Sequence, residues 1–258
     1  MLEEVSHPFR YLRSQWLWSA GSDRPRPRLE RLSWGAAVSA HARARSLSRA
    51  CRALCEVHGV SLRVTGRVPE GPAIFVSNHL GYIDPIAICS LVPCAPVAKE
   101  EVADWPVVGQ LCRRLNVIFV RRSDPASGAA ALWRAMRTLE AGVSVLNFPE
   151  GTTTRGATRL FQRGIFGLSA LMNIPIVPLS ISFDAPELCW VDDETLLGHY
   201  SSEFVGRSPI VHVEVGPGQY LQRGESAAEF AARVRLWIVR AGQAAERARA
   251  ACLTEAES

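Results

Sequence analysis

The fold is decided by residues 73–92, AIFVSNHLGYIDPIAICSLV, which pass from an apolar strand through a polar turn into a helix. The first four residues have the unbroken hydrophobicity of a strand that is covered on both faces. Pro85 suits the first turn of a helix, which predicts a helix over 85–92 with Asp84 as its N-cap. A strand, a turn and a helix in this order form the repeating unit of a parallel α/β sheet.

Strands and helices alternate along the rest of the chain in the same way. Strands are predicted at 61–66, 116–122, 144–149, 174–183 and 209–215, and helices at 32–58, 126–141, 161–172 and 225–251. This order predicts an α/β fold with a mostly parallel central sheet and helices on both faces. We expect a single catalytic domain over residues 59–258, preceded by a helical arm over residues 1–58.

One segment, residues 164–183, carries no charge over twenty positions and is long enough to cross a bilayer. Asn173, Pro175 and Pro178 interrupt it, and its second half is rich in β-branched residues. The pattern therefore predicts a buried helix that ends near Asn173, followed by a buried strand, and no transmembrane helix. The first ten residues lack the apolar core of a secretory signal, so none is expected.

Positive charge is concentrated near the N-terminus. The 258 residues carry a net charge of +4. Residues 1–63 hold eleven arginines against five acids, a balance of +6, whereas the remainder has a balance of −2. Aromatic side chains lie among the first of these arginines, and arginine with tryptophan is typical of a membrane surface. We expect the arm to contact anionic lipid, with packing of its aromatics on the body as the alternative. Basic residues elsewhere are not interleaved with aromatics, so no nucleic-acid partner is expected.

The seven cysteines show no zinc-like spacing and no pairing with histidine. We expect free thiols in a reducing compartment, with no metal site.

The turn NHLGYID, residues 78–84, offers a histidine and an aspartate at the carboxyl edge of a strand, where α/β sheets bind ligands. In a turn, Asp84 can fold back to one imidazole nitrogen of His79 and leave the other nitrogen basic. This is the arrangement of a general base. The alternative is a helix-capping aspartate beside a loop histidine, and the residues alone leave both open.

Two more strand ends carry residues suited to an anion. FPEGTTT, residues 148–154, has a glycine among hydroxyls, and arginines follow at 155, 159 and 163. Arg121 and Arg122 end another predicted strand, and arginine binds phosphate through two parallel hydrogen bonds. The alternatives are a capped turn in the first case and a solvated surface pair in the second.

Taken in order, NHLGYID, FVRR, FPEGTTT and IPIVP (174–178) resemble the four blocks of the glycerolipid acyltransferase family, the 1-acylglycerol-3-phosphate acyltransferases. Lys99, Pro106 and Gly109 form a further family-like stretch, and the resemblance spans roughly residues 60–220. It implies that His79 is a general base oriented by Asp84. It assigns substrate and phosphate binding to a wider set: Asn78, Lys99, Arg121, Arg122, Glu150, Gly151 and Thr152. Within that set, we expect Glu150 to orient Arg122 or the loop amides rather than contact phosphate.

The resemblance implies transfer of a fatty acyl group from acyl-CoA or acyl carrier protein to the free hydroxyl of a lysophospholipid. We expect 1-acylglycerol-3-phosphate as acceptor and phosphatidic acid as product, with no cofactor beyond the thioester co-substrate. No GxSxG motif occurs, which favours direct attack by the acceptor. We expect a peripheral protein at the cytoplasmic face of the membrane.

Two departures from the family pattern leave the acceptor open. Arg121 stands where relatives often have an acidic or polar residue, and the turn reads TTT where many have TRS. A lyso-ornithine lipid is therefore the alternative acceptor. A catalytically silent lipid-binding protein is the alternative of another class, which the intact His79 and Asp84 disfavour.

Overall fold

The computed structural model describes residues 39–105, 108–155, 158–191 and 195–256 of the chain. The aromatic and basic segment of the predicted arm, with its proline-broken linker at 22–31, lies outside the described residues, as does Pro106.

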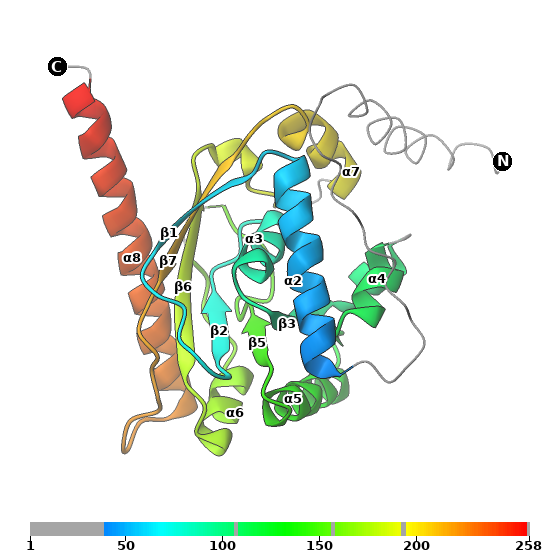
Figure 1. Cartoon of the computed structure of the whole chain (residues 1–258). Helices are drawn as coiled ribbons and strands as arrows, with labels where there is room; N and C mark the ends of the chain where they lie inside the picture. The colour runs from blue at the N-terminus through cyan, green and yellow to red at the C-terminus, as the bar shows by residue number, and fades with distance from the viewer. Residues whose placement is uncertain (1–38, 106–107, 156–157, 192–194, 257–258) are drawn as a thin grey trace.

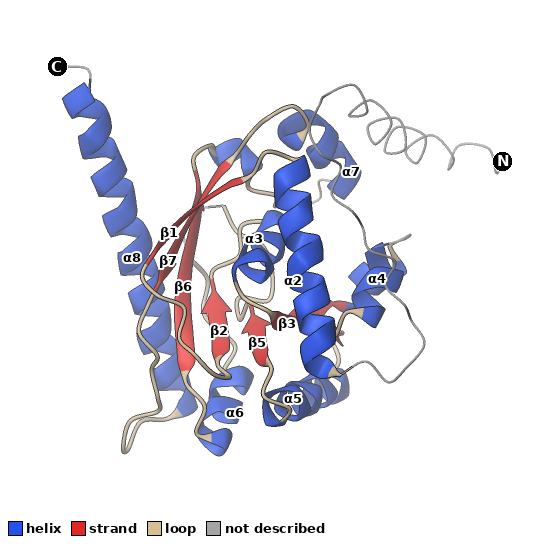
Figure 2. Ribbon diagram, in the orientation of Figure 1, coloured by secondary structure: helices blue, strands red, loops and turns tan. Residues whose placement is uncertain are grey.

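The described residues form one seven-stranded sheet in the order β1-β7-β6-β2-β5-β3-β4, as Figures 1 and 2 show. The strands are β1 (Ser61–Thr65), β2 (Ile74–Ser77), β3 (Cys94–Lys99), β4 (Ile118–Val120), β5 (Ser144–Asn147), β6 (Ile176–Phe183) and β7 (Ile210–Val215). Neighbouring strands are parallel except for the antiparallel pair β6–β7. β1 and β7 therefore run opposite to the other five strands. The predicted mostly parallel sheet is confirmed.

Helices cover both faces of this sheet, as predicted (Figure 1). The α-helices of the described residues are α2 (Ala40–Val57), α3 (Ile83–Leu91), α4 (Val108–Arg114), α5 (Pro125–Glu140), α6 (Gly164–Met172), α7 (Leu196–His199) and α8 (Ala227–Ala256). On one face, α2 and α3 pack against the sheet, and on the other, α5, α6 and α8 do so. β2 contributes to both cores, because Phe75 points to the first and its neighbours Ile74 and Val76 point to the second.

The part of the predicted arm that the structure describes is α2. Ser39 caps this helix by accepting a hydrogen bond from the amide of Ala42 at 3.2 Å. Leu47 and Cys51 are buried in the same core as α3. Arg52 donates two hydrogen bonds to the carbonyl of Ser90 at the end of α3, at 3.0 and 3.2 Å. Residues 40–57 thus pack directly on the body of the molecule.

The uncharged segment 164–183 is a helix and a strand, as predicted. α6 ends at Asn173, which takes the left-handed conformation with φ 51°, and β6 begins three residues later. Asparagine is among the residues that tolerate this conformation at a helix end. Within the described residues, we find no helix whose length and apolarity would let it span a bilayer.

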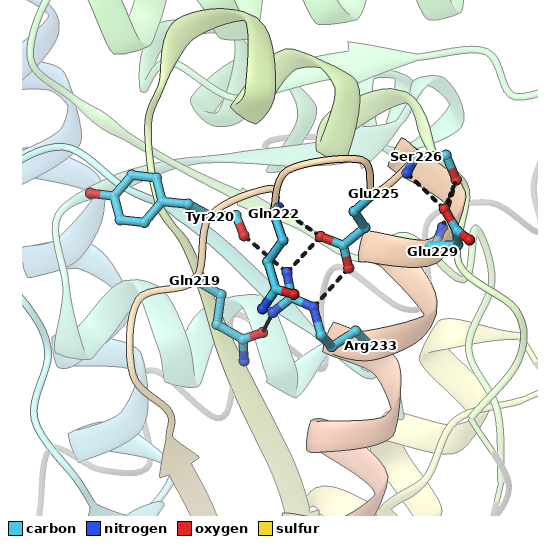
Figure 3. Close-up of polar contacts among 7 residues, drawn as sticks. All are labelled: Gln219, Tyr220, Gln222, Glu225, Ser226, Glu229 and Arg233. Carbon is cyan, nitrogen blue, oxygen red and sulfur yellow. Dashed lines mark hydrogen bonds and ion pairs between the residues drawn. The ribbon is translucent and has the colours of Figure 1, made fainter.

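The start of α8 is fixed by a network of polar side chains (Figure 3). Ser226 and Glu229 form a reciprocal capping box, in which each side chain accepts a hydrogen bond from the other residue's amide. Arg233 pairs with Glu225 at 2.8 Å and also donates to the side chain of Gln219 and the carbonyl of Tyr220. These contacts tie the first two turns of α8 to the loop that precedes it.

Several elements differ from the predictions. β3 was expected neither as a strand nor at its place beside β5, and α4 and α7 were not predicted. α3 begins at Ile83 with Tyr82 as its N-cap, so the prediction that Asp84 caps a helix starting at Pro85 is wrong. The carboxylate of Asp84 instead folds back into the preceding turn, which lets the helix start two residues earlier.

Candidate active site

The centre of the candidate site is a histidine held by a buried carboxylate. His79 follows β2 directly, and its Nδ1 lies 2.7 Å from Oδ2 of Asp84, in the first turn of α3. The same oxygen accepts hydrogen bonds from the backbone amides of Leu80 at 2.5 Å and Gly81 at 2.9 Å. A carboxylate is an acceptor only, so Nδ1 of His79 is the donor in this contact. The predicted pairing of these two side chains is therefore present.

Burial around this pair is uneven. Asp84 is completely buried, and within the described residues its second oxygen, Oδ1, has no hydrogen-bond partner. The side chain of His79 keeps 15% of its surface exposed. Its ring stacks on Phe148 with a centroid distance of 4.2 Å. The aspartate and Phe148 thus fix the imidazole plane, and Nε2 has no hydrogen-bond partner among the described residues.

Glu150 joins the histidine turn to the turn that follows β5. Its Oε1 accepts the backbone amide of His79 at 2.9 Å, and its Oε2 accepts the amide of Arg159 at 2.7 Å and the hydroxyl of Thr154 at 3.2 Å. The amide of Thr154 also donates to the carbonyl of His79 at 2.8 Å. Burial raises the pKa of the Glu150 carboxyl, while these hydrogen bonds act in the opposite direction. The expectation that Glu150 orients loop amides agrees with these contacts.

Gly151 and Arg122 lie close together beside this turn. Gly151 has φ +75°, and a Cβ placed on it would be 3.9 Å from Cδ of Arg122. Arg122 is exposed as a residue, yet desolvation lowers the pKa of its guanidinium, with nearby Glu101 opposing the effect. Thr152 is half-buried in the same turn. The structure therefore brings one arginine next to the glycine turn. An anion can be bound there by the charge of the guanidinium together with backbone amides of the turn.

The other predicted binding residues have different neighbours. Both polar ends of the Asn78 amide bond the backbone of Ile181 in β6, each at 2.9 Å, and thereby extend the pairing of β2 with β6. Arg121 is exposed and pairs with Glu100 at 2.6 Å. Lys99 is half exposed and pairs with Glu101 at 3.1 Å. In this structure the amide of Asn78 positions a strand end, and the two cations lie in surface ion pairs.

Sequence reasoning did not predict that the segment around Cys189 and Trp190 covers the histidine turn. The amide of Trp190 donates to the carbonyl of Leu80 at 2.9 Å, and a Cβ on Gly81 would lie only 3.3 Å from that amide nitrogen. Arg155 donates to the carbonyl of Cys189 at 3.3 Å, which links this cover to the glycine turn. Burial and the charge of Asp84 raise the pKa of the Cys189 thiol to about 11. The signals were Gly81, whose lack of a side chain permits the close approach, and the arginine after TTT.

A second contact holds the same cover in place. Tyr82 donates its hydroxyl to Nδ1 of buried His199 at 3.1 Å, and Nε2 of His199 donates to the carbonyl of Glu187 at 3.0 Å. A carbonyl can only accept, which fixes the tautomer of His199 and makes its Nδ1 the acceptor.

The described residues contain no group of three or more potential metal ligands.

A histidine paired with a carboxylate at the carboxyl edge of a parallel sheet, beside a glycine turn and an arginine, suits general-base chemistry on an anionic ligand. The comparisons with known proteins agree. The model of the Acyltransferase family matches residues 58–182. A relative described as lyso-ornithine lipid O-acyltransferase, from Pseudomonas aeruginosa, is 31% identical over 71% of this chain and 74% of its own length. The chain belongs to the glycerolipid acyltransferase family, and it is an O-acyltransferase by class.

Other relatives carry two kinds of name. A lyso-ornithine lipid O-acyltransferase from Brucella abortus is 26% identical over 65% of this chain and 70% of its own length. A 1-acyl-sn-glycerol-3-phosphate acyltransferase from Limnanthes douglasii is 32% identical over 52% of this chain and 49% of its own length. Among solved structures, the 1-acyl-sn-glycerophosphate acyltransferase PlsC from Thermotoga maritima matches with a TM-score of 0.59. That match covers 92% of this chain and 89% of the other at 22% identity, and it supports the fold.

Proposed function

We propose that this protein transfers a fatty acyl group from acyl-CoA or acyl carrier protein to the free hydroxyl of a lysolipid, with His79 as the general base. The observation that carries the proposal is the 2.7 Å contact between Nδ1 of His79 and the buried Asp84, which leaves Nε2 as the basic nitrogen.

The reaction follows from this geometry. Nε2 of His79 removes the proton of the acceptor hydroxyl while its oxygen attacks the thioester carbonyl. A carbon–oxygen bond forms, the carbon–sulfur bond breaks, and the thiolate leaves with the proton that His79 returns. Asp84 stabilises the imidazolium in between and holds the ring in one tautomer. Catalysis then requires neither a covalent acyl-enzyme nor a cofactor besides the thioester.

For the acceptor, we propose 1-acylglycerol-3-phosphate, which would give phosphatidic acid. Arg122 beside Gly151 supports this choice, since a guanidinium next to a turn with a left-handed glycine suits a phosphate group. Thr152 adds a hydroxyl to the same turn. Lys99 and Arg121 remain candidates for an outer role, in which each would exchange its present carboxylate partner for the head group.

A lyso-ornithine lipid is the second candidate acceptor. Two of the relatives matched over 70% or more of their own length carry that name. The turn TTT, which has no arginine of its own, leaves less positive charge for a phosphate than TRS would.

We further propose that the protein works at the cytoplasmic face of a membrane, where residues 1–31 contact anionic lipid. Vesicle binding by the full chain and by a chain that lacks residues 1–31 tests this part. Equal binding of the two would contradict it.

The test of the base is His79→Ala. We expect acyl transfer to fall by about 10²–10⁴-fold, the usual contribution of one general base, with the fold retained. Release of free thiol from an acyl thioester in the presence of lysolipid measures the rate. His41→Ala is the matched control, because His41 is exposed on α2. Unchanged turnover in the His79 variant would rule out His79 as the base, and an absence of turnover in the wild type would favour the silent lipid-binding protein.

The test of the acceptor is Arg122→Ala, assayed with both lysolipids by mass spectrometry of the products. If Arg122 binds phosphate, KM for 1-acylglycerol-3-phosphate rises by about tenfold or more, since hydrogen bonds to charged groups contribute about 1.5–3 kcal/mol. Arg207→Ala, which removes another exposed arginine in an ion pair, is the control and should leave KM nearly unchanged. An unaltered KM in the Arg122 variant would remove its phosphate role, and product formed from lyso-ornithine lipid alone would establish the second acceptor.

A further inference from the structure

An apolar groove lies on the outer surface of the molecule, between α5 and α6. It encloses about 360 Å³, and its lining is almost wholly hydrocarbon. The lining residues are Leu132, Trp133, Met136, Gly164, Gly167, Leu168 and Leu171. Figure 1 shows the two helices side by side at the end of the molecule away from α7.

The groove exists because α6 lacks side chains where it faces α5. A Cβ on Gly164 would lie 3.2 Å from Cδ1 of Leu132, so a larger residue there would push the two helices apart. A Cβ on Gly167 would meet nothing within 4 Å, which leaves that part of the groove open.

Large apolar side chains project from the same surface. Trp133 is 59% exposed and Leu171 is 77% exposed, and both line the groove. Exposed large apolar side chains that line one apolar groove are typical of an interaction site.

The charge around this surface is positive. Residues 125–173 contain five arginines and two acids. Of the two acids, Glu150 is buried in the candidate active site, and Glu140 already pairs with Arg137 at 2.6 Å. Exposed Arg134 and Arg163 directly adjoin Trp133 and Gly164 in the chain. An exposed tryptophan and leucine with exposed arginines next to lining residues in the chain match an anionic bilayer, whose interface accepts both the indole ring and the cations.

We propose that the α5–α6 surface, defined by the groove with Trp133, Leu171, Arg134 and Arg163, docks on an anionic phospholipid bilayer. The apolar side chains enter the head-group region, and the arginines contact lipid phosphates. An acidic protein would also meet the arginines, but two exposed apolar side chains at a hydrocarbon groove favour lipid. This docking is independent of residues 1–31 and of the identity of the acceptor.

The test uses the full chain and sucrose-loaded vesicles of phosphatidylcholine with about one third phosphatidylglycerol. In the double variant Trp133→Ser/Leu171→Ser we expect vesicle affinity to fall by about tenfold or more, as two buried apolar side chains are lost from the contact. The control is Val57→Ser/Val64→Ser, which removes exposed apolar side chains from α2 and β1 and should bind like the wild type.

Three further measurements complete the test. Leu171→Trp should strengthen binding, which excludes misfolding as the cause of a loss. Arg134→Gln/Arg163→Gln should weaken binding to vesicles with phosphatidylglycerol but not to pure phosphatidylcholine. Unchanged affinity in the double serine variant would overturn the proposal. The proposal would also be overturned if the double serine variant bound vesicles normally but changed its oligomeric state, as measured by light scattering. That result would assign the surface to contact with a second copy of the chain.

Discussion

Glu150 is a residue whose contacts bear on catalysis without reaching the substrate. Its two carboxylate oxygens accept hydrogen bonds from two backbone amides and one hydroxyl, and one of those amides belongs to His79. The carboxylate of Glu150 therefore forms its hydrogen bonds with groups of the protein itself. Its effect on the reaction passes through the position of the imidazole.

This role predicts the behaviour of Glu150→Gln. A glutamine has one acceptor oxygen where the carboxylate has two, so at least one buried amide loses its partner. We expect the free energy of unfolding to fall by about 1–3 kcal/mol and kcat to drop, with little change in KM for the acceptor. Urea unfolding and steady-state kinetics measure the two effects. A large rise in acceptor KM at constant kcat would instead indicate direct contact with the substrate.

Residues that act within one turn could be predicted from the sequence, whereas residues that act between turns could not. The pairing of His79 with Asp84 depends on a local turn, so the spacing was sufficient. The partners of Glu150 and Asn78 depend on which strands lie on either side of β2. Those neighbours are β5 and β6, and neither is adjacent to β2 in the chain. The sequence alone does not specify that adjacency.

At the scale of elements, strands were predictable where they are uniformly apolar. β2, β5 and β6 are almost wholly buried, and most of their residues are apolar. β3 was not predicted, and its sequence CAPVAK contains a proline and a lysine, which are uncommon in central strands. β3 pairs with β5 and β4 nonetheless, because its pairing with these two neighbouring strands outweighs its own weak preference for a strand.

The start of α8 gives a prediction about pH. Arg233 holds the pKa of Glu225 below its ordinary value. A carboxyl whose pKa is lower in the folded state stabilises the protein above its unfolded pKa, and this stabilisation is lost as the pH falls through the folded pKa. At pH 7 we expect Glu225→Gln to lower the free energy of unfolding by about 1–2 kcal/mol.

The difference between wild type and this variant should shrink as the pH is lowered from neutral past about 4, the ordinary range of a glutamate. Denaturant unfolding at a series of pH values measures it. Glu203→Gln is the control, because the Glu203–Arg207 pair is more exposed and should contribute less. A difference that grows toward acid pH would contradict the assignment.

At the scale of the whole molecule, two hydrophobic cores are stacked on one sheet. β2 belongs to both, so a loss of packing on either face affects the strand that carries His79. α2 is part of the first core. Stability and site geometry are therefore coupled across the sheet.

Leu47→Ala tests whether α2 unfolds together with the body. Leu47 is buried against the first core, and removing its side chain should leave a cavity that costs about 2–5 kcal/mol. We expect a single unfolding transition at lower urea, seen equally by circular dichroism and tryptophan fluorescence. Leu54→Ala, on the more exposed side of the same helix, should cost much less. A separate early transition for α2 would show that this helix folds independently of the body.

The hydrogen bonds that join the two turns of the candidate site have a consequence for protein engineering. Residues 78–84 and 148–159 share the hydrogen bonds of Glu150 and the bond from Thr154 to His79. A chimera that imports one turn from a relative and keeps the other would combine partners that were never selected together. The smallest module that can be exchanged between members of this family is therefore both turns at once, and a library that varies head-group preference should be built on that pair.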